Sequence, residues 1–316
     1  MTGPLPGVGG PSGAPAGRTA EVLRRLELDV TRRLDGILHG EHRGLVPGHG
    51  SEPGEAREYQ PGDDVRRIDW NVTARQNHPH LRETVADREL EAWIVADRSA
   101  SLDFGTAAVE KRDLVLAAAA GVGFLTAQGG NRIGAVVSGS EGLTTLPARQ
   151  GRKHLLAALD RIANAARADA RPANGLGAVL RHTASVARRR GLVVVISDFL
   201  DPPERWRHEL ATLVVRHEVL CIEVVDPREL ELPAVGILQL VDPESGATIE
   251  VDTNRRSTRE RYATAAAEQR RAIARAITGA GAAHLQLRTD RDWLLDLARH
   301  VTSRRRRTAN VGRVGA

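Results

Sequence analysis

Carboxylates and hydroxyls follow two apolar segments of this 316-residue chain. The run at 92–96 precedes a D-x-S-x-S pattern, and the run at 192–196 precedes the tripeptide S-D-F. The oxygen-bearing side chains of interest are Asp97, Ser99, Ser101 and Asp198. Oxygen ligands suit hard divalent cations such as Mg²⁺, and two nearby carboxylates repel unless a cation or a hydrogen-bond network joins them. The spacing therefore predicts a divalent-metal site, with helix capping by Asp and Ser as the alternative.

A third strand end supplies a further oxygen. Asn174 lies just before an apolar helical pattern that begins at Leu176, and its side-chain amide can serve as a ligand. The alternative is that Asn174 and Asp198 only cap the helices that follow them. Together with the two carboxylates, Asn174 completes a predicted five-residue set for Mg²⁺ or another divalent cation.

The elements that must position these residues alternate along the chain. Short apolar runs rich in Val, Ile and Leu predict strands at 92–96, 133–137, 192–196, 219–225 and 284–287. Helical patterns lie at about 107–128, 151–167, 176–190, 203–215, 256–279 and 291–302. Alternation of this kind predicts an α/β fold, a mostly parallel sheet with helices on both faces. In such sheets ligands bind beyond the carboxyl ends of the strands, where the candidate residues lie.

The segment from 57 to 70 carries the most specific pattern of the chain. It reads R-E-Y-Q-P-G-D-D-V-R-R-I-D-W and is followed by Ala74-Arg75. With the D-x-S-x-S loop and the S-D-F tripeptide, it resembles the bacterial domain of unknown function 58 family, whose sheet is von Willebrand factor A-like and Rossmann-like. The resemblance covers roughly residues 40–300. It implies association with a MoxR-type AAA+ ATPase and a metal-ion-dependent adhesion-like site.

One position departs from the pattern that the resemblance implies. Asn174 stands where the adhesion site takes a threonine, and Gly175 stands where an aspartate is usual. Arg98 adds a positive charge inside the D-x-S-x-S loop. We therefore expect Mg²⁺ binding to be weak.

The 57–70 segment also suits a docking role. Gln60-Pro61-Gly62-Asp63 fits a type II turn, and its charged side chains are able to form an ion-pair network that fixes a loop. The predicted docking residues are Arg57, Tyr59, Asp63, Asp64, Arg66, Asp69 and Trp70.

The expected organisation follows from these patterns and from turn-rich stretches. It comprises disordered residues 1–16, a helix at 17–39, a family-specific module at 40–90, a von Willebrand factor A-like domain at 91–302 and a basic disordered tail at 303–316. The segments 236–242 and 247–252 flank a turn-rich tetrad and predict an antiparallel hairpin inserted at about 232–253.

The composition of the chain excludes several classes of protein. A single cysteine, Cys221, excludes an internal disulfide framework and fits a reducing cytoplasm. No apolar run reaches the length of a membrane span, and the net charge of +5 is small, so neither a membrane segment nor a nucleic-acid partner is expected. We predict a non-enzymatic adaptor, possessing chaperone-like character, that joins a MoxR-type ATPase to an unidentified protein client. The alternatives are a metal-dependent hydrolase using Asp97 and Asp198, and a nucleic-acid-binding protein.

Overall fold

The computed structural model describes most of the chain. The described residues are 16–37, 56–59, 68, 70–76, 78–82, 90–107, 109–127, 130–139, 142–166, 175–241 and 247–314. They fall into two compact units, one formed by residues 1–45 and 90–316 and the other by residues 46–89. Each unit is described by itself.

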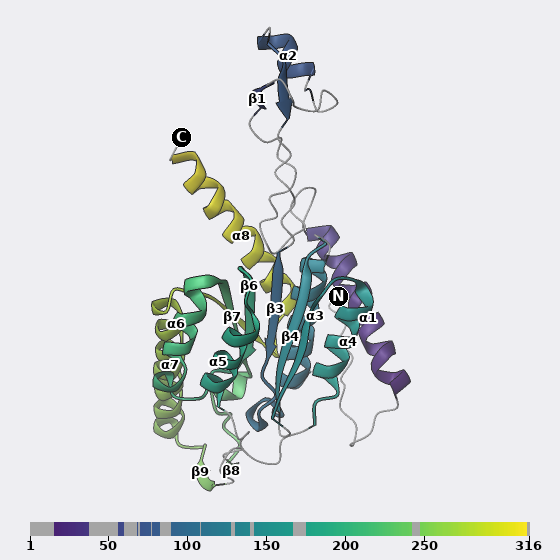
Figure 1. The fold of residues 1–316 in the computed structure, drawn as a ribbon. Coiled ribbons are helices and arrows are strands. Elements are labelled where there is room, and N and C mark those ends of the chain that lie inside the picture. The colour runs from purple at the N-terminus through teal and green to yellow at the C-terminus, as the bar shows by residue number, and fades with distance from the viewer. Residues whose placement is uncertain are drawn as a thin grey trace. The chain divides into compact units, whose positions relative to one another are not determined.

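A six-stranded sheet forms the centre of the larger unit (Figure 1). Its strands are β3 (Glu91–Ala96), β4 (Arg132–Gly139), β5 (Gly142–Arg149), β6 (Gly191–Ser197), β7 (Glu218–Val225) and β10 (Ala283–Arg288). The spatial order is β10-β7-β6-β3-β4-β5, and every neighbouring pair is parallel except β4 with β5. The order reverses between β3 and β6, which makes their carboxyl ends the topological switch point of the sheet.

The inner strands are buried because helices cover both faces. Helices α1 (Ala16–Ile37), α3 (Lys111–Ala127), α4 (Arg152–Ala163) and α8 (Trp293–Val314) pack together on one face, and α5 (Leu176–Val186), α6 (Arg207–Arg216) and α7 (Arg256–Gly279) pack on the other. β3 and β6 consist almost wholly of apolar residues and are buried along their lengths, as parallel strands covered on both faces should be. The predicted α/β fold with a mostly parallel sheet is therefore confirmed.

The buried helix expected between the first two strands is α3. Its apolar segment, from Leu114 onward, lies against the sheet and packs against α1, α4 and α8. No helix in the part of the chain that the structure describes is long and apolar enough to cross a membrane.

Two elements of the larger unit differ from the sequence prediction. β5 was not predicted, because this edge strand mixes exposed polar residues with a proline and lacks an apolar run. α8 continues to Val314, so the structure has helix where a disordered basic tail was expected from 303. Arginine and alanine are good helix formers, which explains how the basic run extends the helix.

The inserted hairpin is confirmed as an antiparallel pair, β8 (Ile237–Val241) and β9 (Thr248–Asp252), in which Leu240 lies opposite Ile249. It connects β7 to α7 by way of the short helix η4 (Pro227–Glu229), and it projects beyond the carboxyl ends of the parallel strands (Figure 1).

The smaller unit holds a second, short antiparallel pair. β1 (Ala56–Glu58) pairs with β2 (His80–Arg82), and α2 (Trp70–Gln76) lies between them in sequence. The hydroxyl of Thr73 accepts a hydrogen bond from the backbone N–H of His80, 3.0 Å away, which fixes α2 to the strand. Residues 1–15, predicted to be disordered, and most of the predicted 40–90 module lie outside the described residues.

Candidate functional site

The switch point brings the two predicted carboxylates to one edge of the sheet. Ala96 of β3 lies beside Ile196 of β6, and Asp97 and Asp198 follow within two residues of this pair. The backbone N–H of Asp97 also donates to the carbonyl of Ile196, at 3.0 Å, so the parallel pairing continues into the loop. The sequence prediction that the two carboxylates share an edge therefore agrees with the geometry.

Asp97 is held by a set of hydroxyl and amide donors. Its Oδ1 accepts from the backbone N–H of Ser99 at 3.0 Å and from the hydroxyl of Ser138 at 3.1 Å. Its Oδ2 accepts from the hydroxyl of Ser197 at 2.7 Å. Burial, and then the negative charge of Asp198, raise the pKa of Asp97 above its ordinary value in spite of these hydrogen bonds. Asp97 is only partly exposed, and the hydrogen bonds that hold it come from hydroxyls and a backbone amide.

The two serines of the D-x-S-x-S loop point into the same cluster. The hydroxyls of Ser99 and Ser101 lie 3.1 Å apart, and Ser101 also hydrogen-bonds the carboxylate of Asp198. Both serines are buried, and Ser101 belongs to the short helix η2 (Ala100–Leu102). The structure therefore brings together four of the five predicted ligands, Asp97, Ser99, Ser101 and Asp198. The fifth, Asn174, lies outside the described residues.

A strained backbone presents Asp198. The next residue, Phe199, has a φ of 55°, in the left-handed region that aromatic residues rarely adopt. Its N–H donates to the hydroxyl of Ser197 at 3.1 Å, and its ring packs edge-on against Trp206 with centroids 5.4 Å apart. Strain of this kind costs about 1–3 kcal/mol and persists only where packing over-determines it, which is typical of functional loops.

Sequence reasoning missed the principal partner of Asp198. Lys111, the first residue of α3, is fully buried, and its Nζ donates to Asp198 Oδ2 at 2.8 Å and to Glu229 Oε1 at 2.7 Å. Burial alone would lower the pKa of Lys111, but the two carboxylates outweigh it and the pKa is raised. Burial likewise opposes ionisation of Asp198, but the attraction of Lys111 holds the pKa of Asp198 below its ordinary value.

The ionic network continues into the body of the domain. Arg270 of α7 donates to the carbonyl of Asp198 at 3.2 Å, to Glu223 Oε1 at 3.0 Å and to Glu229 Oε2 at 3.4 Å. Glu223 is fully buried in β7, and its other oxygen lies 2.9 Å from His284 Nε2 on β10. Burial disfavours its charged form, but His284 and Arg270 together lower the pKa of Glu223. The network therefore connects the strand-end loop to α7 and β10.

The second charge inside the D-x-S-x-S loop, Arg98, contacts the backbone of α3. Arg98 is buried and donates to the backbone carbonyl of Arg112 at 2.9 Å. Burial, and then the positive charge of Arg112, lower the pKa of Arg98 to about 10. Its role is therefore to anchor the loop on α3.

The donor set does not suit a divalent cation. An ion bound to Asp198 would lie within a few ångströms of the Lys111 ammonium, which already occupies one carboxylate oxygen. Two unit charges about 4 Å apart interact by about 4 kcal/mol at an effective dielectric of about 20, and a divalent ion doubles that repulsion. No cluster of three or more His, Cys, Asp or Glu side chains that would hold a metal occurs among the residues with described positions.

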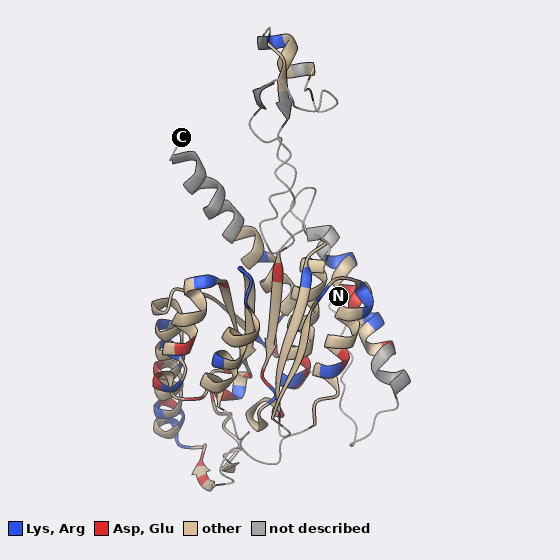
Figure 2. Ribbon diagram, in the orientation of Figure 1, with Lys and Arg blue, Asp and Glu red and all other residues tan. Residues whose placement is uncertain are grey.

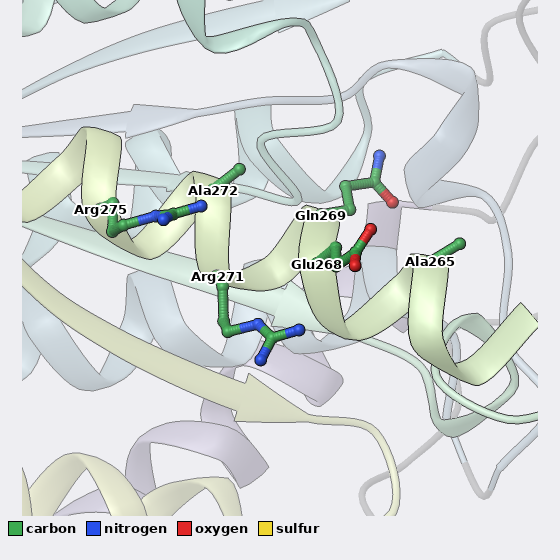
Figure 3. Close-up of a pocket in the computed structure, with 6 residues that line it drawn as sticks. All are labelled: Ala265, Glu268, Gln269, Arg271, Ala272 and Arg275. Carbon is green, nitrogen blue, oxygen red and sulfur yellow. The ribbon is translucent and has the colours of Figure 1, made fainter.

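A surface hollow on α7 is a weaker candidate for a binding site. It is lined by six residues of α7 alone, Ala265, Glu268, Gln269, Arg271, Ala272 and Arg275 (Figure 3). A surface formed by one side of one helix does not enclose a ligand. Basic and acidic side chains are interspersed along this helix (Figure 2).

The predicted docking residues are described only in part. The backbone N–H of Tyr59 donates to the carbonyl of Pro79 at 2.8 Å, and Arg57 belongs to β1. Trp70 opens α2 with 72% of its surface exposed. The remaining four, Asp63, Asp64, Arg66 and Asp69, lie outside the described residues.

Comparison with known proteins shows which family the chain belongs to. The model of the family described as "Protein of unknown function DUF58" matches residues 55–272, so the chain belongs to this family. An uncharacterized protein of Mycobacterium tuberculosis, Rv1480, is 54% identical over 289 residues, which are 92% of this chain and 90% of that protein. An uncharacterized protein of Mycobacterium avium, MAV169, is 44% identical over 164 residues, or 52% of this chain and 96% of that protein.

Two solved structures match this chain at lower sequence identity. The conserved hypothetical protein BatB from Bacteroides thetaiotaomicron is 12% identical, with 68% of this chain and 98% of that chain covered and a TM-score of 0.40. A von Willebrand factor type A structure from Catenulispora acidiphila is 16% identical, with 57% and 42% covered and a TM-score of 0.32.

Proposed function

We propose that this chain is a non-enzymatic interaction protein that binds partners at the carboxyl end of its sheet. The observation that carries the proposal is the β8–β9 hairpin. Ile237 and Val241 lie on one face of β8 and are 71% and 58% exposed. Ile249 of β9, which pairs with Leu240, lies on the opposite face and is 61% exposed. Apolar side chains exposed on both faces of one projecting hairpin are available to a partner that packs around it. A two-stranded hairpin is also marginally stable alone, so a partner that covers these side chains stabilises it.

Contacts within the chain connect the base of the hairpin to the strand-end cluster. Val235, which precedes β8 and is 59% exposed, donates its N–H to the hydroxyl of Thr253 at the base of the hairpin. The segment from Asp226 to Glu229 links this base to Lys111 and Asp198 through Glu229. A partner that contacts the hairpin therefore lies close to the loops that carry Asp97.

The partner that we propose is a MoxR-type AAA+ ATPase, with an unidentified protein client and a chaperone-like outcome in the cytoplasm. Membership of the DUF58 family supports this choice through the resemblance that the 57–70 motif carries. Trp70, exposed at the start of α2, supports a second contact through the smaller unit.

Hydrolysis by Asp97 and Asp198 is a weaker account. A general base must be free to take a proton, and Asp198 is paired with Lys111 at 2.8 Å. Asp97 accepts hydrogen bonds from two serine hydroxyls and one backbone N–H. These contacts favour a positioned loop over a reacting pair.

Capture of the partner tests the proposal. The full chain is used to pull down a MoxR-type ATPase encoded in the same genome, and the double variant Ile237→Lys with Val241→Lys is compared with Val215→Lys. Val215 is 76% exposed near the end of α6, at the opposite end of the sheet, and serves as the matched control. We expect capture by the wild type and the control but not by the hairpin variant, with unchanged circular dichroism. Equal capture by all three would reject the hairpin as the contact.

A further inference from the structure

The ammonium of Lys111 stands where an adhesion-type site would need its cation. It is fully buried on α3, 2.8 Å from Asp198 Oδ2 and 2.7 Å from Glu229 Oε1. A buried charge is tolerated only when it is paired and hydrogen-bonded, and two carboxylates satisfy this condition for the lysine. The negative charge of Asp198 is therefore already compensated from within the chain.

The residue type is informative because the chain is so poor in lysine. Its basic side chains are almost all arginines, and Lys111 and Lys153 are its only lysines. An ammonium is a compact point charge that fits between two carboxylates, whereas the planar guanidinium of arginine is larger and donates in a fixed fork. The geometry between Asp198 and Glu229 suits the compact cation.

Asp97 is the carboxylate of the cluster that lies outside the hydrogen bonds described for Lys111, which run to Asp198 and Glu229. It is partly exposed, and its Oδ2 accepts one hydrogen bond, from Ser197. A carboxylate oxygen has two lone pairs, so Oδ2 retains the capacity for another donor. Ser99, Ser101 and Asp198 are buried around it.

We infer that Lys111 is the resident cation of this sheet edge, that the site works without a divalent metal, and that Asp97 accepts a basic group of the partner. In a metal-dependent adhesion site the partner contributes an acidic side chain to the ion. Here the polarity is reversed, because the partly exposed charged residue of the cluster is the carboxylate Asp97 rather than a metal ion. The choice of a basic partner group rests on the proposed function, whereas the metal-free state of the site does not.

A metal titration tests the first part on the isolated full chain. Calorimetry with Mn²⁺ at millimolar concentrations should show no saturable binding to the wild type. Lys111→Met removes the ammonium with little change in shape and should strengthen Mn²⁺ binding by roughly a hundredfold or more. Lys153→Met, at an exposed position of α4, is the control and should behave as the wild type. Two results would overturn the inference. One is saturable Mn²⁺ binding by the wild type that Asp97→Asn abolishes. The other is a folded Lys111→Met variant that binds Mn²⁺ no better than the wild type.

A measurement on the unaltered protein decides the question if Lys111→Met does not fold. With ¹⁵N-lysine labelling, the chain gives two side-chain signals. The Lys111 ammonium should be protected from exchange with water and unchanged by Mg²⁺, with Lys153 as the internal reference. A shift of Lys111 alone on addition of Mg²⁺ would mean that an ion reaches Asp198, and would contradict the inference.

The polarity is tested with the ATPase partner. Capture should persist in EDTA, and Asp97→Asn should weaken it by roughly 30-fold or more, as expected for loss of one member of a desolvated charge pair. Release by EDTA, or full capture by Asp97→Asn, would reject a basic partner group at Asp97. Failure of the wild type to capture any ATPase would reject the proposed function, while the metal titration would still test the role of Lys111.

Discussion

Asp226 shows how one buried carboxylate fixes the loops around the candidate site. Its two oxygens accept four hydrogen bonds. Thr106 donates two of them, from its backbone N–H at 2.8 Å and from its hydroxyl at 2.6 Å. The N–H of Arg228 donates at 2.9 Å, and the hydroxyl of Thr289 donates at 2.8 Å. These donors come from the loops after β3, β7 and β10. Burial disfavours the charged form, but these hydrogen bonds, led by the hydroxyl of Thr106, lower the pKa of Asp226. The carboxylate therefore stabilises the folded chain only when it is ionised.

Asp226→Asn should lower the free energy of unfolding by about 2–4 kcal/mol at neutral pH, because an amide cannot accept all four hydrogen bonds. The contribution of Asp226 is complete above its unfolded pKa, near 3.8, and is lost as the pH falls through the lower folded value. Urea unfolding at pH 7 and pH 3 should therefore show a smaller difference between variant and wild type in acid. A difference that does not change with pH would contradict the assignment.

The site residues differ in how well sequence reveals them. Asp97, Ser99, Ser101 and Asp198 were predictable because they lie within five residues of the end of an apolar strand, and parallel strands end at the same edge. Lys111 was not, since it lies 87 residues from Asp198 and opens a helix with the charged residues of K-R-D, a pattern typical of a solvated first turn. Long-range pairing of charges carries no local pattern. The one available signal was the rarity of lysine in an arginine-rich chain.

At the scale of elements, α5 approaches the loop after β6 very closely. A Cβ on Gly177 would lie 2.2 Å from the backbone carbonyl oxygen of Arg205, and Asp201 Oδ2 accepts from the N–H of Leu176 at the start of the same helix. Arg205 belongs to the short helix η3 (Pro203–Arg205), which precedes Trp206 and its contact with Phe199. The seating of α5 therefore affects the strained loop that presents Asp198.

Gly177→Ala should destabilise the chain by about 3 kcal/mol or more, because a backbone atom must move to admit the methyl group. Gly279→Ala is the matched control. It adds the same group at the end of α7, where nothing lies within 4 Å, and should stabilise by up to about 1 kcal/mol. Thermal unfolding of both variants measures the contrast. Equal melting temperatures of the two variants would mean that η3 moves to admit the methyl group at little energetic cost.

The elements that sequence predicts well are those in the core. β3, β6, β7 and α3 have apolar runs because both faces are covered, and their bounds differ from the prediction by only a few residues. β5 escaped prediction because it is an edge strand whose residues are mostly exposed or half-buried. The end of α8 was misplaced because a run of arginines is equally typical of a tail and of an exposed helix.

At the scale of the whole molecule, the two units have very different means of stabilisation. β6 pairs with a strand on each side and is buried from Leu192 to Ser197. β1 and β2 are three residues each, and in the described part of the smaller unit they pair with one another and with no other strand. A two-stranded sheet is marginal by itself, whereas amides in a fully paired central strand open only when the whole domain unfolds.

Native-state hydrogen exchange should therefore give different exchange rates for amides in the two units. Amides of β6 should exchange slowest, with a rate that rises with low concentrations of urea in proportion to global unfolding. Amides of β1 and β2 should exchange orders of magnitude faster and with little dependence on urea, because their opening exposes little surface. The β8–β9 hairpin is the internal comparison, since it is also a two-stranded sheet but belongs to the larger unit, and it should resemble β1 and β2 until a partner covers it. Protection of β1 equal to that of β6 would show that the smaller unit unfolds only with the core.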